Sequence, residues 1–329
     1  MTTAAKKNIR IQQGVVLLAL VLFTLKVTAY WLTRSVAVLT DALESIVNII
    51  AGLLGLYSLY LSAKPRDEDH PYGHGKIEFI SAAIEGTLIL IAGVLIIVEA
   101  TRAYFHPKPL LQLDFGIMLI SITAVINYAV GVVCVRAGKK SNSIALLSSG
   151  KHLQSDTYST LGIIVGLMLI MFTKIYWLDS IVAIIFAMLI IFTGYIIIRK
   201  SLAGIMDEAD QVLLQSMVTL LNSNRKENWI DLHNMRLIKY GPVLHLDAHL
   251  TVPWYLNVQQ AHNEIEALAD LVRKDYGESL ELYVHSDGCL DFSCKICTKN
   301  NCSVRKFPFE RKIEWTIENI SKDEKHQLP

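Results

Sequence analysis

The chain has 329 residues, 52% of them hydrophobic and 19% charged, and its mean hydropathy of +0.39 is too high for an ordinary soluble domain. Its formal net charge of +1 gives no overall field that would attract nucleic acid, so we expect no nucleic-acid partner. The apolar residues are concentrated in 11–200, whereas 201–329 has the composition of a soluble protein. Composition therefore indicates a membrane protein with a soluble part attached.

Several apolar segments are long enough to cross the hydrocarbon core, which takes about 20 residues of helix. They lie at 11–33, 36–62, 78–104, 113–137, 143–173 and 177–199. Lys and Arg are more numerous in the loops on the side of the N-terminus, and such loops usually face the cytosol. We therefore expect an all-α, six-helix transmembrane domain over residues 1–206, surrounded by membrane lipid, with both termini in the cytosol.

The residues that follow alternate between helical and strand patterns. Helices are predicted over 207–222 and from a cap at Asn257 to Tyr276, and strands over 232–240, 244–252 (after a Gly241-Pro242 turn) and 280–285. The order αββαβ predicts a small cytosolic α+β domain over 207–288, of the ferredoxin-like kind seen in metallochaperones. A Cys-rich segment over 289–302 and a flexible polar tail over 303–329 are expected to complete the chain.

Two pairs of polar side chains interrupt the apolar segments. Glu44 and Asn48 stand four residues apart in the second segment, and so do His152 and Asp156 in the fifth. On a helix this spacing puts each pair on one face. An ionisable group at membrane depth is costly unless it has a partner or a function. The two pairs together predict a four-ligand site for a divalent cation inside the membrane.

Three stretches of the chain resemble the cation diffusion facilitator family. They are SVAVLTDA at 35–42, HPYGHGK at 70–76 and HLQSD at 152–156, and the likeness in spans, loop and soluble domain covers 11–288. The resemblance implies a homodimeric secondary transporter, not an enzyme, that exports Zn²⁺ or related divalent cations from the cytosol, usually in exchange for protons. The short loops favour a bacterial inner (plasma) membrane protein.

The resemblance also implies three metal sites. The transport site would comprise Glu44, Asn48, His152 and Asp156. A loop site would comprise Asp67, His70 and His74. A regulatory binuclear site at the dimer interface would comprise His233, His249, His262, His285 and Asp287. His245 has no counterpart in the family and is expected at the surface, and Asp41 is expected to orient the transport site rather than bind the ion.

Asn48 departs from the family pattern, because members usually carry Asp there. An amide oxygen is a weaker ligand than a carboxylate, so we expect weaker binding or a preference for harder ions, with His152 as the proton partner. Alternatively, Asn48 only joins the two helices by hydrogen bonds, and water completes the shell. Zn²⁺ is the first expectation for the cargo, and Fe²⁺, Mn²⁺, Co²⁺ and Cd²⁺ stay open.

Four cysteines lie close together just after the last predicted strand. They are Cys289, Cys294, Cys297 and Cys302, and four thiolates within 14 residues suit tetrahedral Zn²⁺. Reduced thiols without a ligand and an iron–sulfur cluster are the alternatives. A second class of function, a membrane metal sensor that binds without transporting, fits the same features. A metallohydrolase lacks support, because no His-Glu-x-x-His or comparable motif is present.

Overall fold

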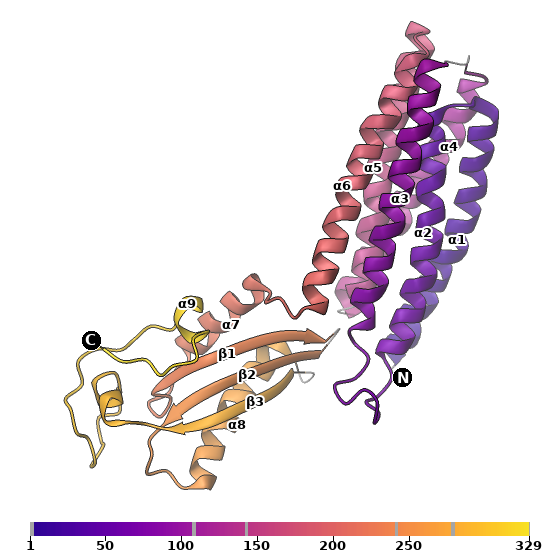
Figure 1. Cartoon of the computed structure of the whole chain (residues 1–329). Helices are drawn as coiled ribbons and strands as arrows, with labels where there is room; N and C mark the ends of the chain where they lie inside the picture. Colours follow the sequence, from indigo (N-terminus) through magenta and orange to yellow (C-terminus); the bar gives the residue numbers. More distant parts are fainter. Residues whose placement is uncertain (1–2, 107–109, 142–143, 241–242, 278–279, 329) are drawn as a thin grey trace. The chain divides into compact units, whose positions relative to one another are not determined.

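The computed structural model of the chain describes residues 3–106, 110–141, 144–240, 243–277 and 280–328. The predicted Gly241-Pro242 turn lies outside these residues. Two compact units make up the chain. One unit consists of Met1–Pro65 with Lys76–Ile205, and the other of Arg66–Gly75 with Met206–Pro329. The first is a bundle of long helices and the second contains the sheet (Figure 1).

The first unit contains six helices that run side by side (Figure 1). They are α1 (Thr3–Thr33), α2 (Val36–Ser62), α3 (Ile77–Phe105), α4 (Leu113–Ser141), α5 (Ile144–Thr173) and α6 (Trp177–Ile205). All six are long and apolar enough to cross a membrane, which confirms the predicted spans. Helix α1 packs against α2 and α4, and α2 also packs against α3. The other close pairs are α3 with α6 and α4 with α5.

Helix α5 is held close to α4 by two glycines that face each other. A Cβ atom added at Gly150 would lie 2.8 Å from the carbonyl oxygen of Gly131 and 2.7 Å from the amide nitrogen of Val135. Only glycine lets two helix backbones approach so closely in a membrane. Because Gly150 lies two residues before His152, this contact sets the position of His152 in the bundle.

The start of α2 is capped by a carboxylate from another helix. Asp179 of α6 is buried and accepts hydrogen bonds from the hydroxyl of Ser35 at 2.6 Å and the backbone amides of Val36 at 2.5 Å and Ala37 at 3.4 Å. The first amides of a helix have no partner within the helix, and the helix dipole favours a negative charge there. Asp179 therefore fixes the N-terminus of the helix that carries Glu44 and Asn48.

A buried ion pair joins α1, α2 and α5. The Nζ atom of Lys26 lies 2.8 Å from Oδ1 of Asp41, and the two side chains are 1% and 0% exposed. The hydroxyl of Thr160 donates to the same Asp41 oxygen at 2.9 Å. Thr160 is one turn after Asp156, so the pair sits beside the predicted transport site. The expectation that Asp41 orients the site stays a prediction, and Lys26 was not predicted to take part.

The second unit has the predicted αββαβ order. Its elements are α7 (Gln211–Ser223), β1 (Asp231–Tyr240), β2 (Val243–Val252), α8 (Val258–Tyr276) and β3 (Leu280–Gly288). The strand order is β1-β2-β3, with β1 antiparallel and β3 parallel to β2. Apolar side chains of α7 and α8 pack against alternate residues of the strands, such as Leu246 and Leu250. The intervening strand residues point to the other face of the sheet.

The chain beyond β3 is more ordered than predicted. A short 3₁₀ helix, η1 (Asp291–Lys295), and a single turn, α9 (Ile317–Ile320), follow the sheet. Trp315 and Ile320 are buried in the same apolar core as the strands, and the amide of Asn234 donates to the carbonyl oxygen of Lys322 at 2.7 Å. The expected flexible tail is therefore wrong for residues 315–322, because two apolar side chains in a polar segment anchor it.

We predict that Lys26→Met destabilises the bundle by about 3–5 kcal/mol, because it leaves the Asp41 carboxylate buried without its cation. Thermal unfolding of the purified protein in detergent measures the loss. The double variant Lys26→Met, Asp41→Leu is the matched control and should recover most of the stability, since it removes both charges. Equal melting of the single variant and the wild type would show that the pair does not stabilise the bundle.

Candidate metal sites

The structure brings the two predicted membrane pairs together through Asn48. Its amide Nδ2 donates to Oδ2 of Asp156 at 2.5 Å, and its Oδ1 lies 2.7 Å from Nε2 of His152. Because an amide oxygen can only accept, His152 carries its proton on Nε2 in this arrangement. The side chain of Asp156 is 2% exposed and that of His152 28%. Asn48 thus links α2 to α5 by hydrogen bonds at both ligands.

All four predicted ligands of the membrane site line one cavity of about 340 Å³. Glu44 and Asn48 reach it from α2, and His152 and Asp156 from α5. The set offers two carboxylates, one imidazole and one amide oxygen, so the carboxylates together match the charge of a divalent cation. Apolar side chains of α3 and α6, such as Ile96 and Phe186, form the opposite wall.

A second cavity of about 380 Å³ meets the first at Asn48 and His152, which line both. It extends along the helix bundle past polar side chains of α1, α2, α3 and α5. These are Gln12, Ser58, Glu78, Ser81, Glu85 and Ser149. The hydrogen-bonded pair therefore stands between two spaces within the bundle.

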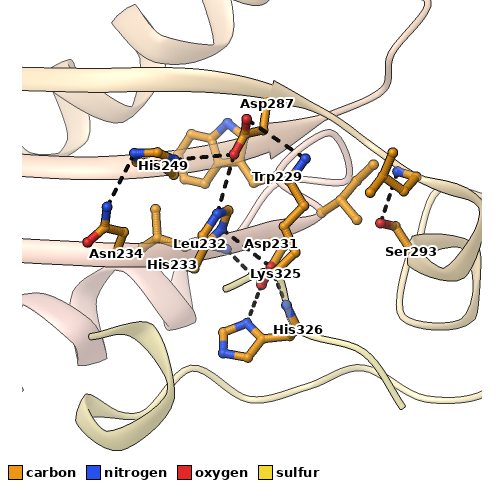
Figure 2. A network of polar contacts seen from close by, with 12 residues as sticks. Trp229, Asp231, Leu232, His233, Asn234, His249, Asp287, Ser293, Lys325 and His326 are labelled. Carbon is orange, nitrogen blue, oxygen red and sulfur yellow. Dashed lines mark hydrogen bonds and ion pairs between the residues drawn. The ribbon is translucent and has the colours of Figure 1, made fainter. Parts of the chain in front are cut away.

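In the second unit, three histidines lie side by side across the sheet. His233 of β1 pairs in register with His249 of β2, which pairs with His285 of β3. Asp287, two residues further along β3, points to the same face. Its Oδ2 lies 3.3 Å from Nε2 of His233 and 3.4 Å from Nδ1 of His249 (Figure 2). Its Oδ1 lies 3.5 Å from Nε2 of His285.

The fifth residue predicted for this site, His262, is not brought to it. It lies exposed on α8. Among the described residues, the ligand atoms of His233, His249 and Asp287 all lie within 4.8 Å of one another, and His262 does not belong to that group. One chain therefore brings together the predicted residues of the strands, with Asp287 beside His233, His249 and His285.

The end of the chain lies against this histidine cluster (Figure 2). Asp231, which is buried, accepts hydrogen bonds from the backbone amide of His326 at 2.9 Å and from Nδ1 of its ring at 2.5 Å. Burial lowers the pKa of His326, but the hydrogen bond and charge of Asp231 outweigh it and raise the pKa above its usual value. Lys325 Nζ lies 3.8 Å from Oδ1 of Asp287 and donates to the carbonyl oxygen of Gly288 at 3.0 Å.

The loop ligands also come together. Asp67 Oδ1 lies 3.0 Å from Nδ1 of His70, and its Oδ2 lies 3.3 Å from Nε2 of His74. These three residues form the other described group with ligand atoms within 4.8 Å. The loop belongs to the second unit, where the ring of Tyr72 packs against that of Tyr240 with their centroids 5.7 Å apart.

His245 is not at the surface, contrary to the prediction. The residue is only 4% exposed. The ring of Tyr72 covers it, with the two ring centroids 5.8 Å apart. Its Nδ1 lies 3.3 Å from Oε2 of Glu281. Glu281 in turn forms an ion pair with Arg66. Burial, with the charge of Arg66, lowers the pKa of His245. The loop therefore covers this residue.

The four clustered cysteines line one small cavity beyond the end of β3, and all four are free thiols. They do not form a group whose sulfur atoms lie within 4.8 Å of one another. Sequence reasoning missed Lys26, Asp231, Lys325 and His326. A lysine inside an apolar segment is a signal that could have identified Lys26, whereas the contacts of the tail have no local signature.

Comparison with known proteins agrees with this architecture. A family model described as the cation efflux transmembrane domain matches residues 14–206, and one described as the cation efflux protein, cytoplasmic domain, matches 209–289. An uncharacterised transporter of Synechocystis is 32% identical over 250 residues, which cover 76% of this chain and 81% of that protein. The segment that contains Cys294, Cys297 and Cys302 lies beyond both family models.

Two similar proteins have names that state a function. The manganese efflux system protein MneP of Bacillus subtilis is 26% identical over 260 residues, covering 76% of this chain and 86% of MneP. The cation-efflux pump FieF of Shewanella oneidensis is 23% identical over 270 residues, covering 82% of this chain and 90% of FieF.

We predict that Lys325→Ala strengthens metal binding at the histidine cluster, because Lys325 competes with the ion for Asp287. An ion pair of this kind contributes about 0.2–1 kcal/mol, so the gain should be about 1.5- to 5-fold. Competition of the purified protein with a fluorescent chelator for Zn²⁺ measures it. Lys322→Ala is the matched control, since Lys322 is a lysine of the same tail whose hydrogen bond to β1 is made by its backbone oxygen, which the substitution keeps. A gain that persists in a His249→Ala background would contradict the assignment to this cluster.

We predict that the tail undocks as pH rises. The pKa of His326 is raised in the folded protein above 6.5, so its bond to Asp231 contributes fully below about pH 6.5 and is lost as pH rises through the folded-state pKa. In metal-free protein, the backbone amides of residues 317–328 should exchange faster as pH rises through this pKa. The increase should exceed the one that pH alone causes in the intrinsic exchange rate of an amide. In His326→Gln this additional change should disappear, and its persistence would exclude His326 as the cause.

Proposed function

The chain belongs to the cation diffusion facilitator family, and we propose that it exports a divalent transition-metal cation across the membrane as a homodimer, by alternating access. One observation carries the proposal: Glu44, Asn48, His152 and Asp156, from two apolar helices, line a single cavity inside the bundle. Polar ligands at that depth have little other use. The cargo binds between α2 and α5, and relative movement of these helices changes the side from which it is reached.

The two cavities support transport rather than simple binding. They meet at Asn48 and His152, so an ion that replaces the hydrogen bond between these residues can be reached from either space. A sensor needs one entrance only. Glu78 and Glu85, which line the second cavity, would attract the cation toward the site.

The donor set supports a harder ion than the Zn²⁺ expected from the sequence. Three of the four ligands are oxygen donors, and carboxylate and carbonyl oxygens suit Mn²⁺, whereas imidazole suits Zn²⁺ and iron. Two similar proteins, MneP and MneS of Bacillus subtilis, are named as manganese efflux proteins. We therefore place Mn²⁺ ahead of Fe²⁺, Zn²⁺, Co²⁺ and Cd²⁺ as the cargo.

Protons are the proposed coupling ion, with His152 as the group that exchanges them. A metal ion can bind Nε2 of His152 only when that nitrogen has no proton. In the structure Nε2 donates its proton to Asn48 in a hydrogen bond. When His152 is protonated on both ring nitrogens, metal binding at Nε2 releases that proton, and a proton that enters from the other side returns to Nε2 as the ion leaves.

The remaining assignments follow the same proposal. The histidine cluster with Asp287 binds a regulatory ion where two copies meet, and the exposed His262 is available to a partner. The loop ligands Asp67, His70 and His74 collect ions for the transport pathway. We place the protein in the plasma membrane, in contact with lipid, with both termini in the cytosol.

Flux in proteoliposomes tests the proposal. Purified protein with an imposed pH gradient should move Mn²⁺ faster than Zn²⁺, and collapse of the gradient should stop this movement. Metal binding without flux would contradict transport and favour a sensor. Flux that does not depend on the gradient would contradict proton coupling alone.

We predict that Asn48→Asp shifts selectivity toward Zn²⁺ and tightens its binding on the order of tenfold, about 1.4 kcal/mol, because a third carboxylate replaces the weak amide ligand. The same flux assay with a panel of metals measures it. Asn263→Asp on α8 is the matched control, since it makes the same chemical change on an exposed surface. Unchanged selectivity in Asn48→Asp would show that Asn48 is not a ligand.

A further inference from the structure

The four cysteines surround one small space behind the sheet. Cys289 directly follows β3, and its amide donates to the carbonyl oxygen of Val252 at 2.9 Å, which extends the sheet by one residue. Cys294 lies in η1, and Cys297 and Cys302 lie in the loop after it. Together they line a cavity of about 20 Å³. A space of that size holds one water-sized particle.

This size discriminates between the ligands that four thiolates could take. A single metal ion fits a space for one small particle, whereas an iron–sulfur cluster contains several iron and sulfide atoms and needs much more room. No three of the four sulfurs lie within 4.8 Å of one another. Binding of one ion to all four sulfurs therefore requires an inward movement of the loop, and a cluster would require a larger space between them than about 20 Å³.

The loop is built to hold the sulfurs in place. The guanidinium of Arg305 donates to the carbonyl oxygens of Cys294 at 2.7 Å, Cys297 at 3.1 Å and Lys299 at 2.7 Å. The amide of Lys306 lies 3.4 Å from the sulfur of Cys294, as a donor to it. Hydrogen bonds to the ligands are what orient a metal site and tune its affinity.

Charge and burial also fit a metal thiolate. Four thiolates and one divalent ion have a net charge of −2, and the cations Arg305 and Lys299 line the same cavity. Cys297 is 6% exposed and packs with the buried Ile230 and Ile296. Without an ion, four thiolates this close would repel one another.

We propose that Cys289, Cys294, Cys297 and Cys302 form a structural site for one Zn²⁺ ion. The site is separate from the transport pathway, and its function is to hold the C-terminal tail in place. Leu328, near the end of the tail, packs against the cluster formed by Ile230, Ile296 and Cys297. Just before Leu328, Lys325 contacts Asp287 of the histidine cluster, and His326 contacts Asp231 at the start of β1.

Cobalt substitution tests the proposal on the full-length protein. Purified, reduced protein loaded with Co²⁺ should show the sulfur-to-cobalt charge-transfer absorption of a tetrahedral thiolate site, and X-ray absorption of the zinc form should show sulfur at about 2.3 Å. Both measurements use the wild type, so they do not depend on the folding of a variant. Bound iron with acid-labile sulfide, or zinc with no sulfur neighbour, would overturn the proposal.

Variants then assign the ligands and the role. Cys294→Ser with Cys297→Ser should abolish the charge-transfer band and increase proteolysis of residues 303–328. Cys134→Ser is the matched control, because Cys134 is the fifth cysteine and is buried in α4. Loss of the band in the control, or retention in the double variant, would refute the assignment. A band that is lost without any change in the tail would refute the structural role.

Discussion

The cost of an unpartnered charge in an apolar bundle determines how α2 is held. Asp179 caps its first turn, Lys26 pairs with Asp41 at its next turn, and Asn48 joins it to His152 and Asp156 one to two turns further on. Each contact comes from a different helix or side of the bundle, and each satisfies a group that hydrocarbon cannot solvate. Asn48, His152 and Asp156, three of the residues that would bind the cargo, are thus held by polar contacts with one another.

Asn48 shows how this requirement is met between α2 and α5. An aspartate there would place a second carboxylate next to Asp156, and the pair would need a cation or a proton to stay together. The amide instead donates to Asp156 and accepts from His152. A cation that binds as proposed would replace both hydrogen bonds, which would lower its affinity and ease its release.

The same arrangement occurs in the second unit. Lys325 lies beside Asp287, and His326 lies beside Asp231, so nitrogen groups of the tail partly neutralise the carboxylates that an ion would otherwise balance. The three histidines need no such device, because the sheet register alone puts them side by side. At the sites proposed above, metal binding would exchange these partners for the ion, and Lys325 and His326 are the tail residues that such an exchange would affect.

Whether a contact can be predicted from the sequence depends on how many residues separate its two partners along the chain. A spacing of four on a helix and of two on a strand is local, so the membrane pairs and the face shared by His285 and Asp287 could be predicted. Lys26 with Asp41 and Ser35 with Asp179 are partners 15 and 144 residues apart, which no local pattern shows.

His245 illustrates the limit most clearly. Its spacing of four residues from His249 on β2 puts the two on the same face of the sheet, so strand periodicity cannot distinguish them. What differs is the covering: Tyr72, from a loop more than 170 residues earlier in the chain, covers His245 but not His249. His249 is left beside Asp287. Whether a histidine of this strand can be a candidate ligand depends on which side chains from distant parts of the chain cover it, and only the folded structure shows that.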